Sequence, residues 1–162
     1  MSFASPFKLG PFIVDEEGRL YPRVSDKVPS FSVCWRDRLL HLRLSRAAAA
    51  GATQLSLGVQ AVLGRIPSTA EAIGPGRRDE AFALLRDLAP ALPTGWEISL
   101  FADHRVRLDL RSGLELPTSA TALVTAVTVL LLELAPYLDV LDAEGIVAVP
   151  RSAEGMANAW PG

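Results

Sequence analysis

The segment from Ser119 to Leu138, SATALVTAVTVLLLELAPYL, constrains the fold more than any other part of the chain. It carries a single charge, Glu133, and it is apolar on almost every side. A helix on a small domain needs only one apolar stripe, so a helix that is apolar all round must be covered from more than one direction. The segment therefore predicts a buried helix with a second covering partner.

A membrane span is the first alternative reading of this segment. The uninterrupted apolar and threonine stretch runs from Ala120 to Leu132, which is well short of the roughly 20 residues that a bilayer requires. Glu133, Pro136 and Asp139 then close it off. The opening residues, MSFASPFKLGPF, contain one lysine and lack the apolar core of a secretory signal. We therefore expect no membrane partner and a cytoplasmic location.

Length and charge restrict the remaining classes. A chain of 162 residues fits one domain and buries roughly two thirds of its unfolded surface. A net charge of −2 argues against a general nucleic-acid binder. Lys8 and Lys27 are the only lysines among 16 basic residues, a bias typical of a GC-rich bacterial genome. The single cysteine, Cys34, excludes an internal disulfide, and its place in an alternating strand favours a small core residue.

Turn residues divide the chain into elements, and three regions are expected: an N-terminal arm and hairpin (1–27), an α+β core (28–146) and a loosely held tail (147–162). In the core, period-two alternation predicts three antiparallel strands between 31 and 66, with the first turn at Asp37 and Arg38. Helical spacing then predicts a helix over 78–92, a hairpin over 96–111 and the long helix over 119–138. The expected class is α+β: an antiparallel sheet of about five strands packed against two helices, in the order β-β-β-α-β-β-α after the N-terminal hairpin.

The sequence holds few groups that could carry chemistry. It lacks phosphate-binding loops, nucleophile elbows and metal-ligating helix motifs, so no catalytic residue, cofactor or metal is expected. His41 and His104 are its two histidines, too few for a multi-histidine metal site in one chain. The pair Asp103 and His104 could form an acid/base dyad, although a turn role is favoured. The acidic run 15–17 and the loop 74–78 are interpreted as a solvated hairpin tip and a flexible loop, against cation and anion sites.

The faces of the long helix can be assigned from its spacing. Leu123, Val127, Leu130, Leu134 and Leu138 form the core stripe. A stripe of small residues and threonine remains for a second covering element; its candidate interface residues are Thr121, Ala122, Thr125, Ala126, Thr128 and Val129. Either the chain's own elements or a second copy would cover this stripe, and a two-fold homodimer is the commonest soluble oligomer.

The order and size of these elements resemble the type III secretion chaperone-like fold, also found in YbjN-like proteins. The stretch from Gly95 to Leu141 carries most of the resemblance. It implies a homodimeric, non-enzymatic protein that binds a segment of another polypeptide. The chain departs from the family at its start, where a hairpin with prolines replaces an amphipathic helix on the surface presented to cargo.

A second class of function is a small-molecule-binding or catalytic α+β domain. Its pocket would lie between the sheet and the long helix, lined by aromatic residues such as Trp35, Trp96 and Phe101. A closed core with a large apolar two-fold interface would favour the interaction protein, whereas a deep pocket with polar lining would favour this alternative.

Overall fold

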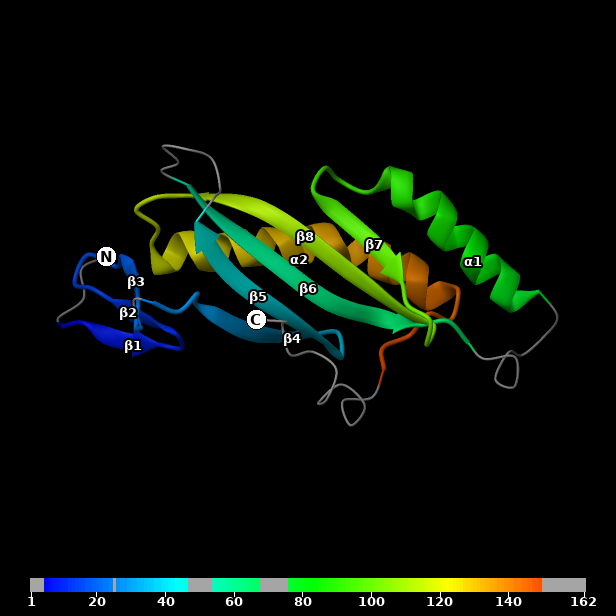
Figure 1. The fold of residues 1–162 in the computed structure, drawn as a ribbon, viewed down its shortest axis with the longest axis horizontal. Helices are drawn as coiled ribbons and strands as arrows, with labels where there is room; N and C mark the ends of the chain where they lie inside the picture. The colour runs from blue at the N-terminus through cyan, green and yellow to red at the C-terminus, as the bar shows by residue number, and fades with distance from the viewer. Residues whose placement is uncertain (1–4, 25, 47–53, 68–75, 150–162) are drawn as a thin grey trace.

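The computed structural model describes residues 5–24, 26–46, 54–67 and 76–149, and these form two antiparallel sheets and two α-helices (Figure 1). A small sheet has the order β1-β2-β3, and a five-stranded sheet has the order β4-β5-β6-β8-β7. The elements are β1 (Phe7–Leu9), β2 (Phe12–Val14), β3 (Leu20–Pro22), β4 (Ser30–Trp35), β5 (Arg38–Arg46), β6 (Gln54–Arg65), α1 (Arg77–Leu88), a 3₁₀ turn (Ala89–Ala91), β7 (Trp96–Leu100), β8 (Arg105–Glu115) and α2 (Ala120–Ala143). The predicted class and element order are confirmed.

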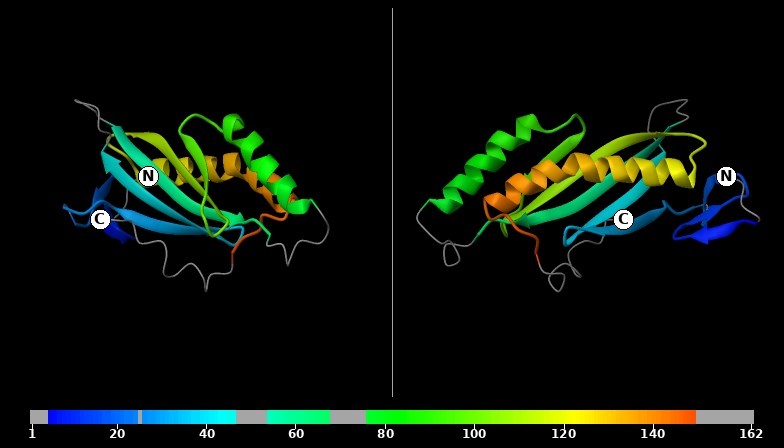
Figure 2. Two further views of the ribbon diagram at one scale, coloured as in Figure 1. Left: turned by 45° about the vertical axis from the view of Figure 1, so that its right-hand side comes forward. Right: turned by 180° about the vertical axis from the view of Figure 1, so that it is seen from behind.

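The large sheet buries one face, and within the described residues no helix covers the other. Figure 2 shows α2 running along one side of the sheet, with α1 beside its C-terminal half. Alternation places every second side chain on the covered face. The buried side chains of that face and its helices include Leu40, Leu42, Leu44, Leu57, Val59, Leu108, Leu110, Ala81, Leu85, Leu130, Leu134, Leu138 and Leu141. The opposite face, here called the open face, carries the polar members of the same strands.

The turn between β4 and β5 differs from the predicted one by one residue. Arg36 and Asp37, and not Asp37 and Arg38, occupy the turn, with φ of 48° and 60°. Positive φ at both central positions is the pattern of a type I′ hairpin turn, whose twist matches that of the flanking strands. Arg38 consequently becomes the first residue of β5 and shares a face with Leu40. Its side chain is 3% exposed.

Helix α2 is longer than its sequence predicted. It begins at the expected N-cap, where the Ser119 hydroxyl accepts from Ala122 N at 3.0 Å. It continues through Pro136 to Ala143, because Pro136 lies on the exposed side, where one lost backbone hydrogen bond can be tolerated. Gly145, with a φ of 79°, ends the helix.

By length and composition alone, α2 could cross a membrane. It has 24 residues, and its most apolar stretch has a mean hydropathy of 1.8. The expectation that this segment is too short to span a bilayer is therefore wrong, since it counted only the uninterrupted stretch from Ala120 to Leu132. In this structure the leucine stripe of α2 lies on the sheet, and 28% of the residues in the apolar stretch are buried. Most of the helix surface remains uncovered.

The small sheet joins the rest of the molecule at the start of α2. Leu20 N donates to Thr118 O, and Ala120 N donates to Gly18 O, both at 3.0 Å. The ring of Phe12 meets that of Phe31 on β4 edge to face, with centroids 6.1 Å apart. The predicted N-terminal hairpin is present as β2 and β3, and β1 adds a strand that the sequence did not indicate. The tail from residue 150 lies outside the described residues.

Candidate functional site

An uncovered apolar surface runs along the outer face of α2. Val124, Val129, Leu132 and Val140 are large apolar side chains that point away from the core. Leu132 is 67% exposed, the highest value among the large apolar side chains of the described residues. A row of exposed apolar side chains on one face is typical of a surface that contacts another protein or a membrane.

The predicted partner stripe lies on this outer face. Five of its members are exposed, and Ala126 is half-buried against the core; the exposed members are Thr121, Ala122, Thr125, Thr128 and Val129. Sequence reasoning missed Val124, Leu132 and Val140. The spacing of Thr121, Thr125 and Thr128 continues to position 132, so the same helical period would have identified Leu132.

An apolar groove of about 350 Å³ separates the small sheet, β4 and the first half of α2. We call this site the apolar groove; its lining is Leu9, Gly10, Pro11, Phe12, Phe31, Val33, Leu123, Val124, Val127 and Thr128. Three elements far apart in sequence thus contribute to one site. Threonine supplies its only hydroxyl, and the Thr128 hydroxyl already donates to Val124 O at 2.8 Å.

Strand β4 forms an edge of the large sheet beside this groove. In the part of the chain that the structure describes, its only strand partner is β5. Leu44 N donates to Pro29 O at 2.9 Å, which fixes the alternation along the pair. Phe31 and Val33 therefore direct their backbone groups toward β5, and Ser30 and Ser32 direct theirs outward. Edge strands usually carry charges, prolines or bulges, but the sequence of β4, SFSVCW, has no charged residue and no proline.

A basic hollow adjoins the start of β4. It has a volume of about 310 Å³, and Arg23 and Lys27 line it together with Val28 and Ser30. Its lining contains two cationic side chains and no carboxylate. The edge strand thus contributes residues both to the apolar groove and to a positively charged hollow.

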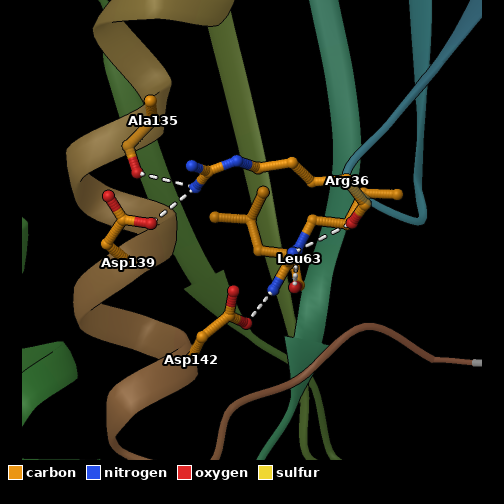
Figure 3. A network of polar contacts seen from close by, with 6 residues as sticks. Arg36, Leu63, Ala135, Asp139 and Asp142 are labelled. Carbon is orange, nitrogen blue, oxygen red and sulfur yellow. Dashed lines mark hydrogen bonds and ion pairs between the residues drawn. The ribbon is translucent and has the colours of Figure 1, made fainter.

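The C-terminal half of α2 is fixed to the β4–β5 hairpin by two arginines (Figure 3). Buried Arg38 donates to Asp142 Oδ1 and to Leu63 O, each at 2.5 Å, and to Arg36 O at 3.1 Å. Arg36 reaches Asp139 at 2.6 Å and the carbonyl of Ala135 at 3.4 Å. Burying a guanidinium is costly unless its donors are satisfied, and these acceptors satisfy them. This network fixes the C-terminal half of α2 to the β4–β5 hairpin, and we call this part of the molecule the closed end (Figure 3).

A row of polar side chains crosses the open face. Strand register aligns Ser32, His41, Gln60 and Asp109 on four neighbouring strands. Ser32 Oγ lies 2.9 Å from His41 Nδ1, and Gln60 Nε2 donates to Asp109 Oδ1 at 2.8 Å. The serine and histidine resemble part of a hydrolytic triad, but Asp109 pairs with Arg107 and does not orient the histidine.

The three aromatic residues proposed to line a pocket do not converge. Trp96 packs against Tyr137 of α2, with ring centroids 5.8 Å apart. Phe101 lines a hollow on the open face. Trp35 is half-buried beside Arg36, whose guanidinium lies 5.2 Å from its ring. Trp35 and Trp96 therefore belong to the packing under α2, and Phe101 belongs to a different surface.

Asp103 and His104 point to different partners and do not form a dyad. Asp103 accepts from Arg105 Nε at 2.5 Å, and the His104 ring contacts Phe82 of α1. Desolvation raises the pKa of Asp103, but hydrogen bonds from the backbone and side chain of Arg105 outweigh it, so that the pKa lies below 3.8. His104 has a φ of 65°, as expected of a turn residue.

The remaining candidates from the sequence are Cys34, the acidic run 15–17 and the loop 74–78. Cys34 is exposed on the open face, so the expected core position is wrong; the alternation was correct, but neither of the two helices in the described part of the chain covers that face. Asp15 accepts from the backbone of Glu17 and Arg19, which makes the acidic run a hairpin tip. Of the loop 74–78, residues 74 and 75 lie outside the described residues, whereas Gly76 is the N-cap of α1 and Arg77 and Arg78 are its first residues. The described residues contain no cluster of acidic, histidine or cysteine side chains fit to hold a metal.

Comparison with protein-family models, curated proteins and solved structures finds no match to this chain.

Proposed function

We propose that this chain is a protein-interaction domain that binds an extended segment of another polypeptide along β4, and that it acts as a homodimer through the outer face of α2. The observation that supports strand binding most directly is the contact between an uncharged edge strand and the apolar groove. Phe31 and Val33 belong to both. The proposal agrees with what the chaperone-like resemblance implies, in a cytoplasmic protein without catalytic activity.

The edge and the groove suit the same ligand. A strand paired with β4 would bond to the outward backbone groups of Ser30 and Ser32. Its side chains alternate between the two faces of the sheet, so every second one would lie above the groove beside Val124 and Val127. Arg23 and Lys27 would face an acidic residue at one end. The preferred partner is a segment with apolar residues at every second position and a carboxylate at one end.

The outer face of α2 suits a second copy because its exposed side chains are mostly apolar or small. A two-fold axis would place Leu132 of one chain beside the same region of another, with small threonine side chains allowing close approach. Val124 and Thr128 belong both to the outer face and to the lining of the apolar groove, so the dimer interface would border the groove beside β4.

Selection from a library of displayed random peptides tests strand binding. We expect enriched sequences in which apolar residues alternate with polar ones. Ser32→Pro removes an outward N–H but keeps the ladder with β5, so it should abolish capture, as a proline on an edge strand is otherwise tolerated. Ser32→Ala is the matched control, since it removes the hydroxyl alone and should retain capture. Enrichment without alternation, or capture by Ser32→Pro, would overturn the proposal.

Light scattering at micromolar concentration tests the homodimer. The wild-type chain should have twice the mass of one chain, and Leu132→Arg or Thr125→Arg should halve it while the circular dichroism spectrum remains unchanged. Asp87→Arg on exposed α1 provides the control and should stay dimeric. A monomeric wild type, or dimeric Leu132→Arg and Thr125→Arg variants, would remove the outer face of α2 from the proposal.

A further inference from the structure

A second hollow lies on the open face, on the side of the sheet opposite α2. It has a volume of about 250 Å³ and is lined by His41, Gln60, Val62, Phe101, Arg105 and Arg107. Strand register assembles it, because His41 is opposite Gln60 and Val62 is opposite Arg107. We call it the polar hollow. It shares no lining residue with the apolar groove.

His41, which lines this hollow, has one buried ring nitrogen without a hydrogen-bond partner among the described residues. Its Nδ1 lies 2.9 Å from the Ser32 hydroxyl, whereas its buried Nε2 has no hydrogen-bond partner among the described residues. When the hydroxyl donates to Nδ1, Nε2 carries the proton and is a donor. Buried polar atoms are nearly always hydrogen-bonded, so an unpaired one on a hollow indicates an acceptor supplied from outside.

Two guanidinium groups are held in place beside this donor. Arg105 Nε lies 2.5 Å from Asp103, and Arg107 lies 2.7 Å from both oxygens of Asp109. These pairs occupy part of each guanidinium, which has five N–H donors in a fixed plane. The side chains of Arg105 and Arg107 are 24% and 31% exposed, so their remaining donors can still be reached. Gln60 donates a hydrogen bond to Asp109 and so helps to hold the carboxylate that pairs with Arg107.

One wall of the hollow is apolar. The guanidinium of Arg107 lies 5.7 Å from the ring centre of Phe101, and Val62 contributes an aliphatic surface. A ligand that fits must therefore combine acceptor oxygens with a small flat apolar body. A carboxylate matches the planar guanidinium donors, and hydrogen bonds to a charged acceptor are the stronger kind.

We propose that the polar hollow binds a small organic carboxylate with a flat apolar body. The carboxylate accepts from His41 Nε2 and from the guanidinium groups, and the body lies against Phe101 and Val62. This site is separate from the pocket expected between the sheet and the long helix, and it does not depend on the polypeptide-binding proposal.

The two histidines of the chain make a direct test by proton NMR with benzoate as the probe. Benzoate should shift the ring signals of His41 in a saturable manner and leave those of His104, which packs against Phe82 on α1, in place. A His41→Gln variant assigns the two sets of signals. Benzamide has the same shape without the charge and should cause a much smaller shift. Equal shifts with benzamide, no shift with millimolar benzoate, or equal movement of His104 would overturn the proposal.

A pair of arginine substitutions on β8 locates the binding site. Arg105→Gln should weaken benzoate binding about tenfold, because a charge-assisted hydrogen bond is lost. Arg111→Gln lies on the open face of the same strand outside the hollow and should change the affinity by less than about twofold, since exposed distant charges are screened. Equal effects of the two substitutions would show nonspecific attraction to the arginines of the sheet and would contradict the site.

Discussion

The two ends of α2 meet the sheet in different ways. At its C-terminal end, Leu134, Leu138 and Leu141 are at most 1% exposed, and Arg38 fixes the helix to the hairpin. At its N-terminal end, Leu123 is buried but Val124 is 60% exposed above the apolar groove. One end is packed and closed, and the other is accessible. The same helix is therefore tightly packed at one end and leaves apolar side chains exposed beside a groove at the other.

Truncating one leucine at each end gives the largest expected effects. Leu138→Ala should lower the free energy of unfolding by about 4 kcal/mol, because it leaves a cavity in the closed end. Leu123→Ala should cost about 2 kcal/mol, since its cavity opens into the groove and can be filled by water. Urea denaturation measures both. Equal losses would mean that the two ends are packed alike.

The arginine network provides the next comparison. Asp142→Ala removes the carboxylate partner of buried Arg38 and should cost about 3 kcal/mol, as an unpaired buried charge remains. Asp139→Ala breaks an ion pair whose carboxylate is 66% exposed and should cost less than about 1 kcal/mol. Thermal and urea unfolding of the two variants measures the two losses in the free energy of unfolding. Similar losses of unfolding free energy in the two variants would show that the burial of Arg38 does not determine how strongly the closed end is stabilised.

Two glycines on β6 give the smallest expected difference. A Cβ at Gly64 would lie 2.6 Å from Val147 O and 2.7 Å from Ile146 O, in the chain that follows α2. Gly64→Ala should therefore cost about 2 kcal/mol through overpacking. At Gly58 the nearest atom would be Arg43 O at 3.8 Å, so Gly58→Ala should stay within about 0.5 kcal/mol of wild type. A destabilised Gly58→Ala with an unchanged Gly64→Ala would contradict this reading of the closed end.

Local sequence patterns predicted the helices and strands, whereas the candidate sites depend on how those helices and strands are arranged in space. The alternation of Leu40, Leu42 and Leu44 was enough to identify a strand covered on one face. Arg38 was missed because it was assigned to the turn, whereas β5 begins at Arg38 and alternation then places it on the same face as Leu40. Exposure of Cys34 depends on which face the helix covers, and local alternation is the same in either case. The polar hollow depends on the register of three strands, which no single segment encodes.

Main-chain bonds hold α2 near both of its ends. At its start, Gly18 O accepts from Ala120 N and Thr118 O accepts from Leu20 N. After its end, Arg65 N donates to Val147 O at 3.2 Å. Backbone hydrogen bonds do not depend on the identity of the outward side chains. Substitutions at exposed positions such as Thr125 and Leu132 can therefore change which surface the helix presents without moving the helix itself. A fold built in this way can acquire new partners over evolution while its architecture is conserved.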